Sequence, residues 1–183
     1  MDKRLDFIFK RRSIRRFEPQ PVEGDKVQAL LEAAMAAPSA ANRQPWKFVV
    51  VTRRELLDQL ASVHPYAKML GEATLCIAVC GEPAVSLASS EGDRFWVQDC
   101  SAAMQNLLLA AANLGLGSVW LGVHPTRQRE DEIREVLGLP DNIIPLGIAA
   151  MGYPAEEKPA QTRYDETRVH REIYGGENPA CPR

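Results

Sequence analysis

No stretch of this 183-residue sequence is apolar over the roughly 20 residues that a membrane-spanning helix needs. The chain also lacks an excess of either charge, because 22 Lys and Arg stand against 24 Asp and Glu. It therefore has no global basic field to hold nucleic acid or an anionic membrane, and we expect neither as a partner. The segment Met1–Asp6 carries acids and no apolar core, so we expect no export signal.

Cysteine is scarce, and its four positions fit no known cysteine motif. Cys76, Cys80, Cys100 and Cys181 have neither zinc nor iron–sulfur spacing, and they form no Cys-x-x-Cys pair. We therefore expect reduced thiols and a cytoplasmic protein. The three histidines are His64, His124 and His170. They are far apart, so we expect them to be structural or exposed and predict no metal site.

The composition is that of one ordinary globular domain over residues 1–183, with 45% hydrophobic and 25% charged residues. Hydrophobic periodicity and β-branched runs give the expected elements. The expected strands are 46–52, 74–80, 118–121 and 143–151, and the expected helices are 2–10, 27–35, 55–60, 95–114 and 130–137. The strand 74–80 is apolar throughout, which predicts burial on both of its faces.

Residues 95–114 form the longest expected helix, with Gly115 as its C-terminal cap. This helix is apolar nearly all round, so it must be central or lie at a subunit interface. Residues 152–183 form a proline-containing tail with little periodicity, too long for a loop inside a compact domain. We expect the tail to lie extended on a partner subunit.

A cluster of cations, Lys10-Arg11-Arg12-Ser13-Ile14-Arg15-Arg16-Phe17, is the first candidate for chemistry. It could be a solvated basic turn at a helix end. It could equally be an anion site, because arginine forks bind phosphate in bidentate fashion and Ser13 adds a hydroxyl. Nucleic-acid binding is a third interpretation, but no aromatic platform or wider basic surface supports it.

Two further segments combine unusual residues. The loop Ala37–Trp46 places Asn42 and Gln44 between two prolines, and amides can read the edge of a heteroaromatic ring. A plain helix-to-strand connector would explain the prolines but not both amides. The segment Gly115–Gly122 is no dinucleotide fingerprint, because it lacks the final glycine and runs from helix to strand. Its glycines would either form ordinary turns or let the backbone approach a flat ligand.

Taken in this order, the clusters resemble the nitroreductase family of FMN-dependent oxidoreductases. The matching segments are 11–17, Ala37-Pro38-Ser39 with Asn42, Gln44, Pro45 and Trp46, then 105–111, 115–118, and a tail with Lys158-Pro159, Arg163 and Val169-His170. The resemblance covers about residues 7–175. It implies an α+β fold, a nitroreductase-like three-layer sandwich around a central, mainly antiparallel sheet. It also implies an intertwined homodimer that holds one FMN at each of two interface sites.

The resemblance also assigns the phosphate and pyrimidine contacts of FMN. It implies that Arg11 and Arg163 bind the phosphate. Arg12 and Ser13 would contact the ribityl chain, the phosphate and the pyrimidine edge, and Arg15 would lie near flavin N1 and O2. A ribityl-binding Asn shortly before a Lys, present in some larger members, is absent here, where Pro65 precedes Lys68. A flavin contact from Lys68 or Lys158 therefore stays open.

The flavin ring would be covered from two sides. Leu121 and Gly122 would run along the ring, with a backbone N–H reaching N5. The partner subunit would supply Pro38, Ser39, Ala40, Asn42 and Gln44. Ala40 replaces a serine that is frequent in the family, so only its backbone is expected to make contact.

The implied activity is reduction of nitroaromatic or quinone-type acceptors with hydride from NAD(P)H, in a ping-pong sequence at flavin N5. The cofactor carries such chemistry, so we name no catalytic acid or base. Alternatives are a flavoprotein of the same fold that destroys flavin or removes halogen, and a non-enzymatic FMN-binding protein. The loop Glu82–Arg94 is short, polar and rich in small residues, which indicates an open loop rather than a rigid lid and hence a broad acceptor range.

Overall fold

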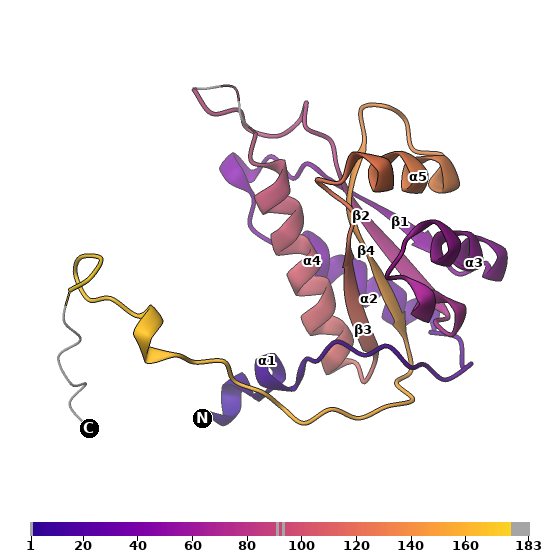
Figure 1. Ribbon diagram of the computed structural model, residues 1–183, viewed down its shortest axis with the longest axis horizontal. Coiled ribbons are helices and arrows are strands. Elements are labelled where there is room, and N and C mark those ends of the chain that lie inside the picture. The colour runs from indigo at the N-terminus through magenta and orange to yellow at the C-terminus, as the bar shows by residue number, and fades with distance from the viewer. Residues whose placement is uncertain (1, 91, 93, 177–183) are drawn as a thin grey trace.

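The computed structural model describes residues 2–90, 92 and 94–176, which fold into helices on both faces of one sheet (Figure 1). The strands are β1 (Trp46–Val51), β2 (Leu75–Gly81), β3 (Gly117–Gly122) and β4 (Ile144–Gly152). The helices are α1 (Asp6–Lys10), α2 (Gly24–Met35), α3 (Arg54–Val63), α4 (Trp96–Asn113) and α5 (Arg127–Leu137). Four 3-10 turns accompany them: η1 (Lys3–Leu5), η2 (Ala40–Asn42), η3 (Lys68–Gly71) and η4 (Glu166–Arg168).

The sheet has the strand order β1-β2-β4-β3, and every neighbouring pair is antiparallel. Its central strand β2 is buried along its whole length, as the apolar run predicted. The expected strands are confirmed, with ends that differ by at most one residue. The order leaves β1 and β3 at the two edges, so one side of β3 has no neighbouring strand.

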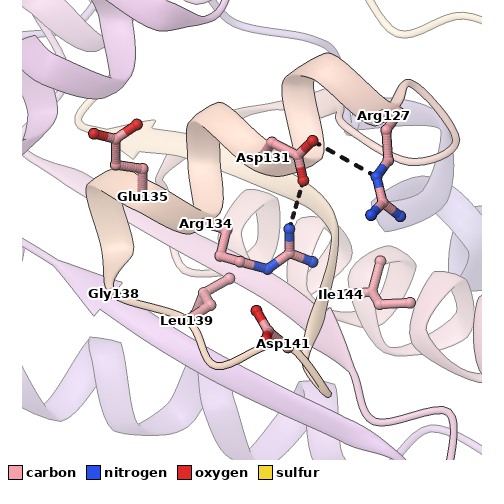
Figure 2. Close-up of a pocket in the computed structure, with 8 residues that line it drawn as sticks. All are labelled: Arg127, Asp131, Arg134, Glu135, Gly138, Leu139, Asp141 and Ile144. Carbon is pink, nitrogen blue, oxygen red and sulfur yellow. Dashed lines mark hydrogen bonds and ion pairs between the residues drawn. The ribbon is translucent and has the colours of Figure 1, made fainter.

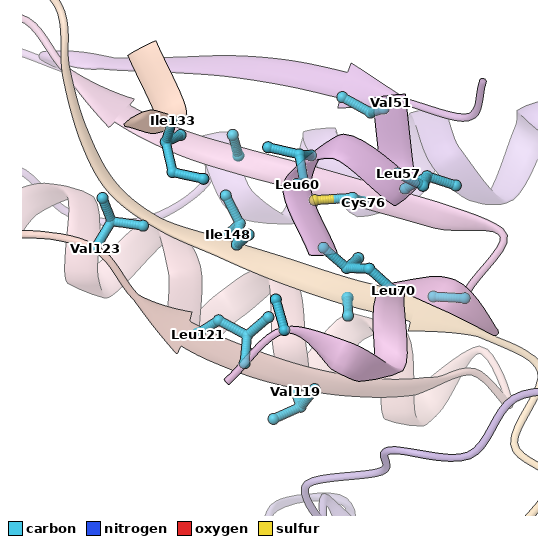
Figure 3. Packing of buried hydrophobic residues seen from close by; sticks show 14 of the residues in the cluster. Val51, Leu57, Leu60, Leu70, Cys76, Val119, Leu121, Val123, Ile133 and Ile148 are labelled. Carbon is cyan, nitrogen blue, oxygen red and sulfur yellow. The ribbon is translucent and has the colours of Figure 1, made fainter. Parts of the chain in front are cut away.

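Two apolar clusters form the layers on the two faces of the sheet. On one face, α2 and α4 pack over alternate residues of β2 and β4, such as Ile77 and Ala149. On the other face, α3, α5 and η3 cover the residues between them, such as Cys76 and Ile148 (Figure 3). The three-layer α+β sandwich is therefore confirmed, because side chains of a strand alternate between two covered faces.

Helix α4 runs along one face and is apolar on most of its surface, with eight of its residues buried. It ends where expected, since Gly115 follows it in the left-handed conformation with φ of 76°. Leu116 N–H then bonds back to Ala111 O at 2.8 Å, which satisfies a carbonyl of the last turn. Asp99, in the first turn, is buried.

The two ends of the chain lie side by side. Glu18 N–H donates to Tyr153 O at 2.9 Å, Ala155 N–H to Arg16 O at 2.9 Å, and Gln161 N–H to Phe9 O at 3.1 Å. The first part of the tail thus runs antiparallel to residues 9–18 of its own chain. Beyond it the tail extends away from the body (Figure 1), with Tyr174 91% exposed. Packing of the tail on a partner stays a prediction.

Some helix boundaries differ from those expected. One helix over 2–10 was expected, but Asp2 caps the separate turn η1, and the non-helical backbone of Leu5 divides that turn from α1. Helix α5 begins three residues before the expected position, at Arg127. Its first turn is entirely polar, so hydrophobic periodicity could not mark it.

Candidate functional site

The basic segment after α1 is held between β3 and the tail. Ser13 forms a parallel bridge with Ser118 of β3, and Ile14 N–H donates to Ser118 O at 3.0 Å. From the tail, Lys158 Nζ donates to Ser13 O at 2.7 Å, and Arg15 N–H donates to Glu156 Oε1 at 2.6 Å. Lys158 is thus engaged with the backbone of this segment. The segment is a fixed part of the fold and not a loose basic arm.

Three guanidinium groups gather where the tail meets this segment. Burial lowers the pKa of Arg11, and the nearby charges of Arg163 and then Arg12 lower it further. Arg12 donates to the carbonyl of Pro159, and within the described residues Arg11 forms no ion pair. Neighbouring positive charges repel one another, and in the absence of a carboxylate a bound anion would offset this repulsion. The cluster is therefore a candidate anion site.

The outer edge of β3 presents backbone groups to the space beside it. Ser118 O accepts from Ile14 on this outer side, whereas Val123 N–H bonds inward to Leu146 O of β4. The N–H and C=O of successive strand residues alternate between the two sides. Those of Trp120 and Gly122 therefore also point outward, and among the described residues Trp120 has no backbone partner there. An unpaired strand edge is a ready template for another hydrogen-bonding partner.

A hollow of about 540 Å³ lies against this edge. It includes three residues that the sequence predicted for one site, namely Arg15, Leu121 and Gly122. Its other lining residues are His64, Pro65, Tyr66, Lys68, Met69, Trp120 and Arg129. Lys68, which the sequence left open, therefore lies with Arg15. Within the described part of the chain the side chains of Arg15 and Lys68 form no ion pair, so the hollow suits an electron-rich ligand.

His64 and Tyr66 are lining residues that sequence reasoning missed. His64 was expected to be structural or exposed, and it is 2% exposed. Its Nε2 lies 3.0 Å from Gly122 O, and Tyr66 N–H donates to its Nδ1 at 3.3 Å. Arg129 lies over the Tyr66 ring, 5.4 Å from its centre. These residues come from the loop after α3 and from α5, and no local pattern marks them.

The loop with the two amides is a second, separate group. Ala41, Asn42 and Gln44 have φ of 47°, 53° and 50°, a left-handed backbone that costs residues other than glycine about 1–2 kcal/mol each. Gln44 N–H donates to Ser39 Oγ at 3.0 Å, and Gln44 Nε2 donates to Asn42 Oδ1 at 2.8 Å. The amides therefore hold the loop itself together.

This loop is anchored to the N-terminal end of α4, beside which Figure 1 shows the turn η2. Ala40 N–H donates to Asp99 Oδ1 at 2.9 Å, and within the described residues Asp99 Oδ2 has no partner. None of Pro38, Ser39, Ala40, Asn42 or Gln44 lines the hollow at β3. Within one chain, the predicted residues at the hollow and those of the loop therefore form two separate groups. Strained backbone of this kind is concentrated at functional sites.

A larger hollow, of about 860 Å³, lies against α5 and the loop that follows it (Figure 2). Its two arginines already face one carboxylate. Arg134 Nη1 lies 2.7 Å and Arg127 Nε 3.6 Å from oxygens of Asp131. The hollow contains no residue that the sequence singled out, so its size alone does not make it the functional site.

Two other classes of site find no support in the part of the chain that the structure describes. No three His, Cys, Asp or Glu side chains there are grouped so as to hold a metal ion. No helix there is long and apolar enough to cross a bilayer.

Comparison with known proteins gives consistent matches. The model of the nitroreductase family matches residues 8–153. A protein of Archaeoglobus fulgidus, provisionally named an NADH dehydrogenase/NAD(P)H nitroreductase, is 43% identical over 95% of this chain and 100% of its own. The crystal structure of a protein of the same provisional name from Bacteroides thetaiotaomicron has a TM-score of 0.88, at 42% identity over 95% and 99% of the two chains.

A third match was solved with a ligand. It is a provisionally named nitroreductase from Desulfovibrio desulfuricans in complex with FMN. Its TM-score is 0.77, at 30% identity over 94% of this chain and 98% of that one.

Proposed function

This chain belongs to the nitroreductase family of oxidoreductases, and we propose on that premise that it binds FMN and transfers electrons from NAD(P)H to small organic acceptors. The Archaeoglobus relative is named for NADH and NAD(P)H, and the Desulfovibrio structure contains FMN. The observation that carries the proposal is a guanidinium cluster without a carboxylate, on the segment that borders the open edge of β3.

The phosphate of FMN would bind at the guanidinium cluster. Arg11 and Arg163 supply the charge, and Arg12 and Ser13 complete the proposed contacts with the phosphate and ribityl chain. Guanidinium forks form bidentate, charge-assisted hydrogen bonds with phosphate. The pKa of Arg11 is lowered first by burial and then by repulsion from Arg163 and Arg12, and a phosphate would relieve that repulsion. The residues therefore fit a mononucleotide, and the sequence offers no dinucleotide fingerprint for the adenosine half of FAD.

The flavin ring would lie in the hollow at β3, against Leu121 and Gly122. Outward-pointing backbone N–H groups of β3 would donate to acceptor atoms of the ring. Arg15 and Lys68 line the same hollow. Fixed cations there would stabilise negative charge that develops on the pyrimidine ring when electrons arrive, without any reorganisation of solvent.

A homodimer would complete the site. The strained loop with Pro38, Ser39, Ala40, Asn42 and Gln44 is separate from the hollow of its own chain, so we propose that it covers the flavin bound by a partner. The tail beyond the segment that pairs with residues 9–18 would pack on that partner too. Three cysteines are buried free thiols, which supports a reducing, cytoplasmic location.

When bound, FMN would supply the redox chemistry, the transfer of hydride from NAD(P)H at N5 and of electrons to a nitroaromatic or quinone in a ping-pong sequence. The protein binds and orients: the arginines hold the phosphate, the edge of β3 holds the ring, and the cations tune its charge. We assign no side chain as nucleophile, general acid or general base.

The first test is to identify the cofactor of the purified protein. Heat release followed by chromatography should give FMN, and FAD or no flavin would overturn the proposal. Anaerobic titration of the holoprotein with NADH and then NADPH should bleach the visible absorbance of the flavin. A bound flavin that neither donor reduces would instead indicate a non-enzymatic FMN-binding protein. A reduced flavin that quinones and nitroaromatics fail to reoxidise would indicate other flavin chemistry.

A further inference from the structure

Gly122, the last residue of β3, occupies a weakly packed position at the mouth of the hollow. A Cβ built on it would meet no atom within 4 Å, so the space into which a side chain would project is open. Glycine has the greatest backbone freedom of all residues, and this one ends an edge strand. Hydrogen bonds to the peptide groups of Gly122 therefore matter more for their orientation than packing around a side chain.

The side chain of His64 supplies that constraint. His64 is buried between the Tyr66 N–H group and the Gly122 carbonyl oxygen. An N–H can only donate, so His64 Nδ1 accepts from Tyr66 and carries no proton. The proton of the neutral imidazole is therefore on Nε2, which donates to Gly122 O at 3.0 Å.

A second donor reaches the same carbonyl oxygen less closely. Arg129 Nη1 lies 3.4 Å from Gly122 O, beyond the usual range for a strong hydrogen bond. The Arg129 guanidinium also lies over the ring of Tyr66, whose backbone N–H orients His64. The loop after α3 and the helix α5 thus meet at one carbonyl oxygen, with His64 as the closer contact.

We infer that His64 is a positioning residue, which fixes the end of β3 so that the Gly122 N–H is presented to the flavin. In an extended residue the N–H and C=O point to the same side, so holding the carbonyl of Gly122 also sets the direction of its N–H. This inference rests on the proposed FMN site. The imidazole touches neither cofactor nor substrate in this role, and it transfers no proton.

Two substitutions separate the two hydrogen bonds of His64. In His64→Asn the side-chain oxygen can occupy the position of Nδ1, which retains the bond from Tyr66 but loses the one to Gly122. In His64→Gln the amide nitrogen can occupy the position of Nε2, which retains the bond to Gly122. Leu57→Ala is the matched control, because it opens a cavity at a fully buried residue of α3 without touching Gly122.

The first measurement uses the FMN-free protein. Amide hydrogen exchange at Val123 and His124, whose N–H groups both donate to Leu146 O at 3.1 Å just beyond Gly122, should be at least fivefold faster in His64→Asn than in the wild type. It should be near the wild-type rate in His64→Gln. Leu57→Ala should lower the melting temperature while leaving the rates at these two amides within twofold. Equal rates in the Asn and Gln variants would overturn the inference.

The second measurement uses FMN itself. The FMN dissociation constant should rise about 2- to 12-fold in His64→Asn, the range expected for one hydrogen bond, and less than twofold in His64→Gln. The flavin midpoint potential should shift in the Asn variant alone. If the wild type binds no FMN, the proposed function fails, and the exchange rates still decide whether His64 holds the strand. If the wild type binds and reduces FMN but the two variants do not differ, only the inference about His64 fails.

Discussion

The guanidinium cluster predicts that one substitution will weaken FMN binding without destabilising the empty protein. Arg11→Met keeps the apolar stem and removes the charged fork. The pKa of Arg11 lies below its ordinary value, first because of burial and then because of Arg163 and Arg12. In the absence of an anion that charge opposes folding. We therefore expect FMN-free Arg11→Met to be at least as stable to urea as the wild type.

The loss of affinity can be sized from the contact that disappears. A hydrogen bond to a charged group contributes about 1.5–3 kcal/mol, which corresponds to about a 10- to 150-fold rise in the FMN dissociation constant. Quenching of flavin fluorescence on binding measures this constant. Any gain in stability of the FMN-free variant should shrink as salt is added, because salt screens the repulsion among the arginines.

Arg16→Met is the matched control, because Arg16 belongs to the same basic segment but is paired with Glu72 at 2.9 Å. An exposed ion pair contributes at most about 1 kcal/mol to stability, and this one is outside the cluster. The control should bind FMN like the wild type. A dissociation constant for Arg11→Met within twofold of the wild-type value would remove Arg11 from the site. A loss of stability in FMN-free Arg11→Met greater than that of the control would refute the repulsion argument.

Three further predictions concern the assembly, the thiols and the acceptors. Sedimentation at micromolar concentration should show a dimer and no folded monomer, and a stable monomer that retains FMN would contradict the shared site. Burial raises the pKa of Cys76, Cys80 and Cys100 to about 12, so these thiols should react with a thiol reagent at pH 8 only after denaturation. Because unfolded thiols ionise near pH 9.0 and the folded ones do not, the free energy of unfolding should fall as the pH rises from 9.0 towards 12, and a constant value there would contradict the assignment. In a panel of quinones and nitroaromatics, kcat/KM should vary little, and strict selectivity for one acceptor would contradict an open site. Replacing residues 82–94, of which 91 and 93 lie outside the described part, by a short Gly/Ser link should alter the profile, and an unchanged profile would show that the loop is only a connector.

The strands of the sheet could be predicted from sequence because each is a short run of apolar or β-branched residues. The run from Cys76 to Val79 is short, apolar at every position and contains two β-branched residues, which is typical of a strand covered on both faces. The strand order could not be predicted in this way. Whether Gly122 ends an edge strand depends on which other strands lie beside β3, and that is set by contacts distant in the chain.

The candidate site likewise combines residues that a local motif reveals with residues that only distant contacts bring together. Arg11, Ser13 and Arg15 stand in one motif, which the sequence shows directly. Lys68 and Arg15 line the same hollow only because the chain folds. The absence of the family's Asn before Lys68, where this chain has Pro65, therefore could not indicate where Lys68 lies. The positive φ of Ala41 was equally hidden, because alanine carries no preference for that backbone. Such a conformation is imposed by the hydrogen bonds around it.

The pairing of the chain's two ends has a consequence for the order of events during synthesis. Arg11 and Arg163 belong to the same cluster but stand 152 positions apart in the sequence. At typical rates of 5–20 residues per second, the ribosome adds Arg163 roughly 8–30 s after Arg11. During most of its synthesis a nascent chain therefore contains Arg11 and Arg12 of the cluster but lacks Arg163. If the cluster holds the phosphate of FMN as proposed, loading would follow release of the tail, and FMN would select chains that contain Arg163 over chains truncated before it.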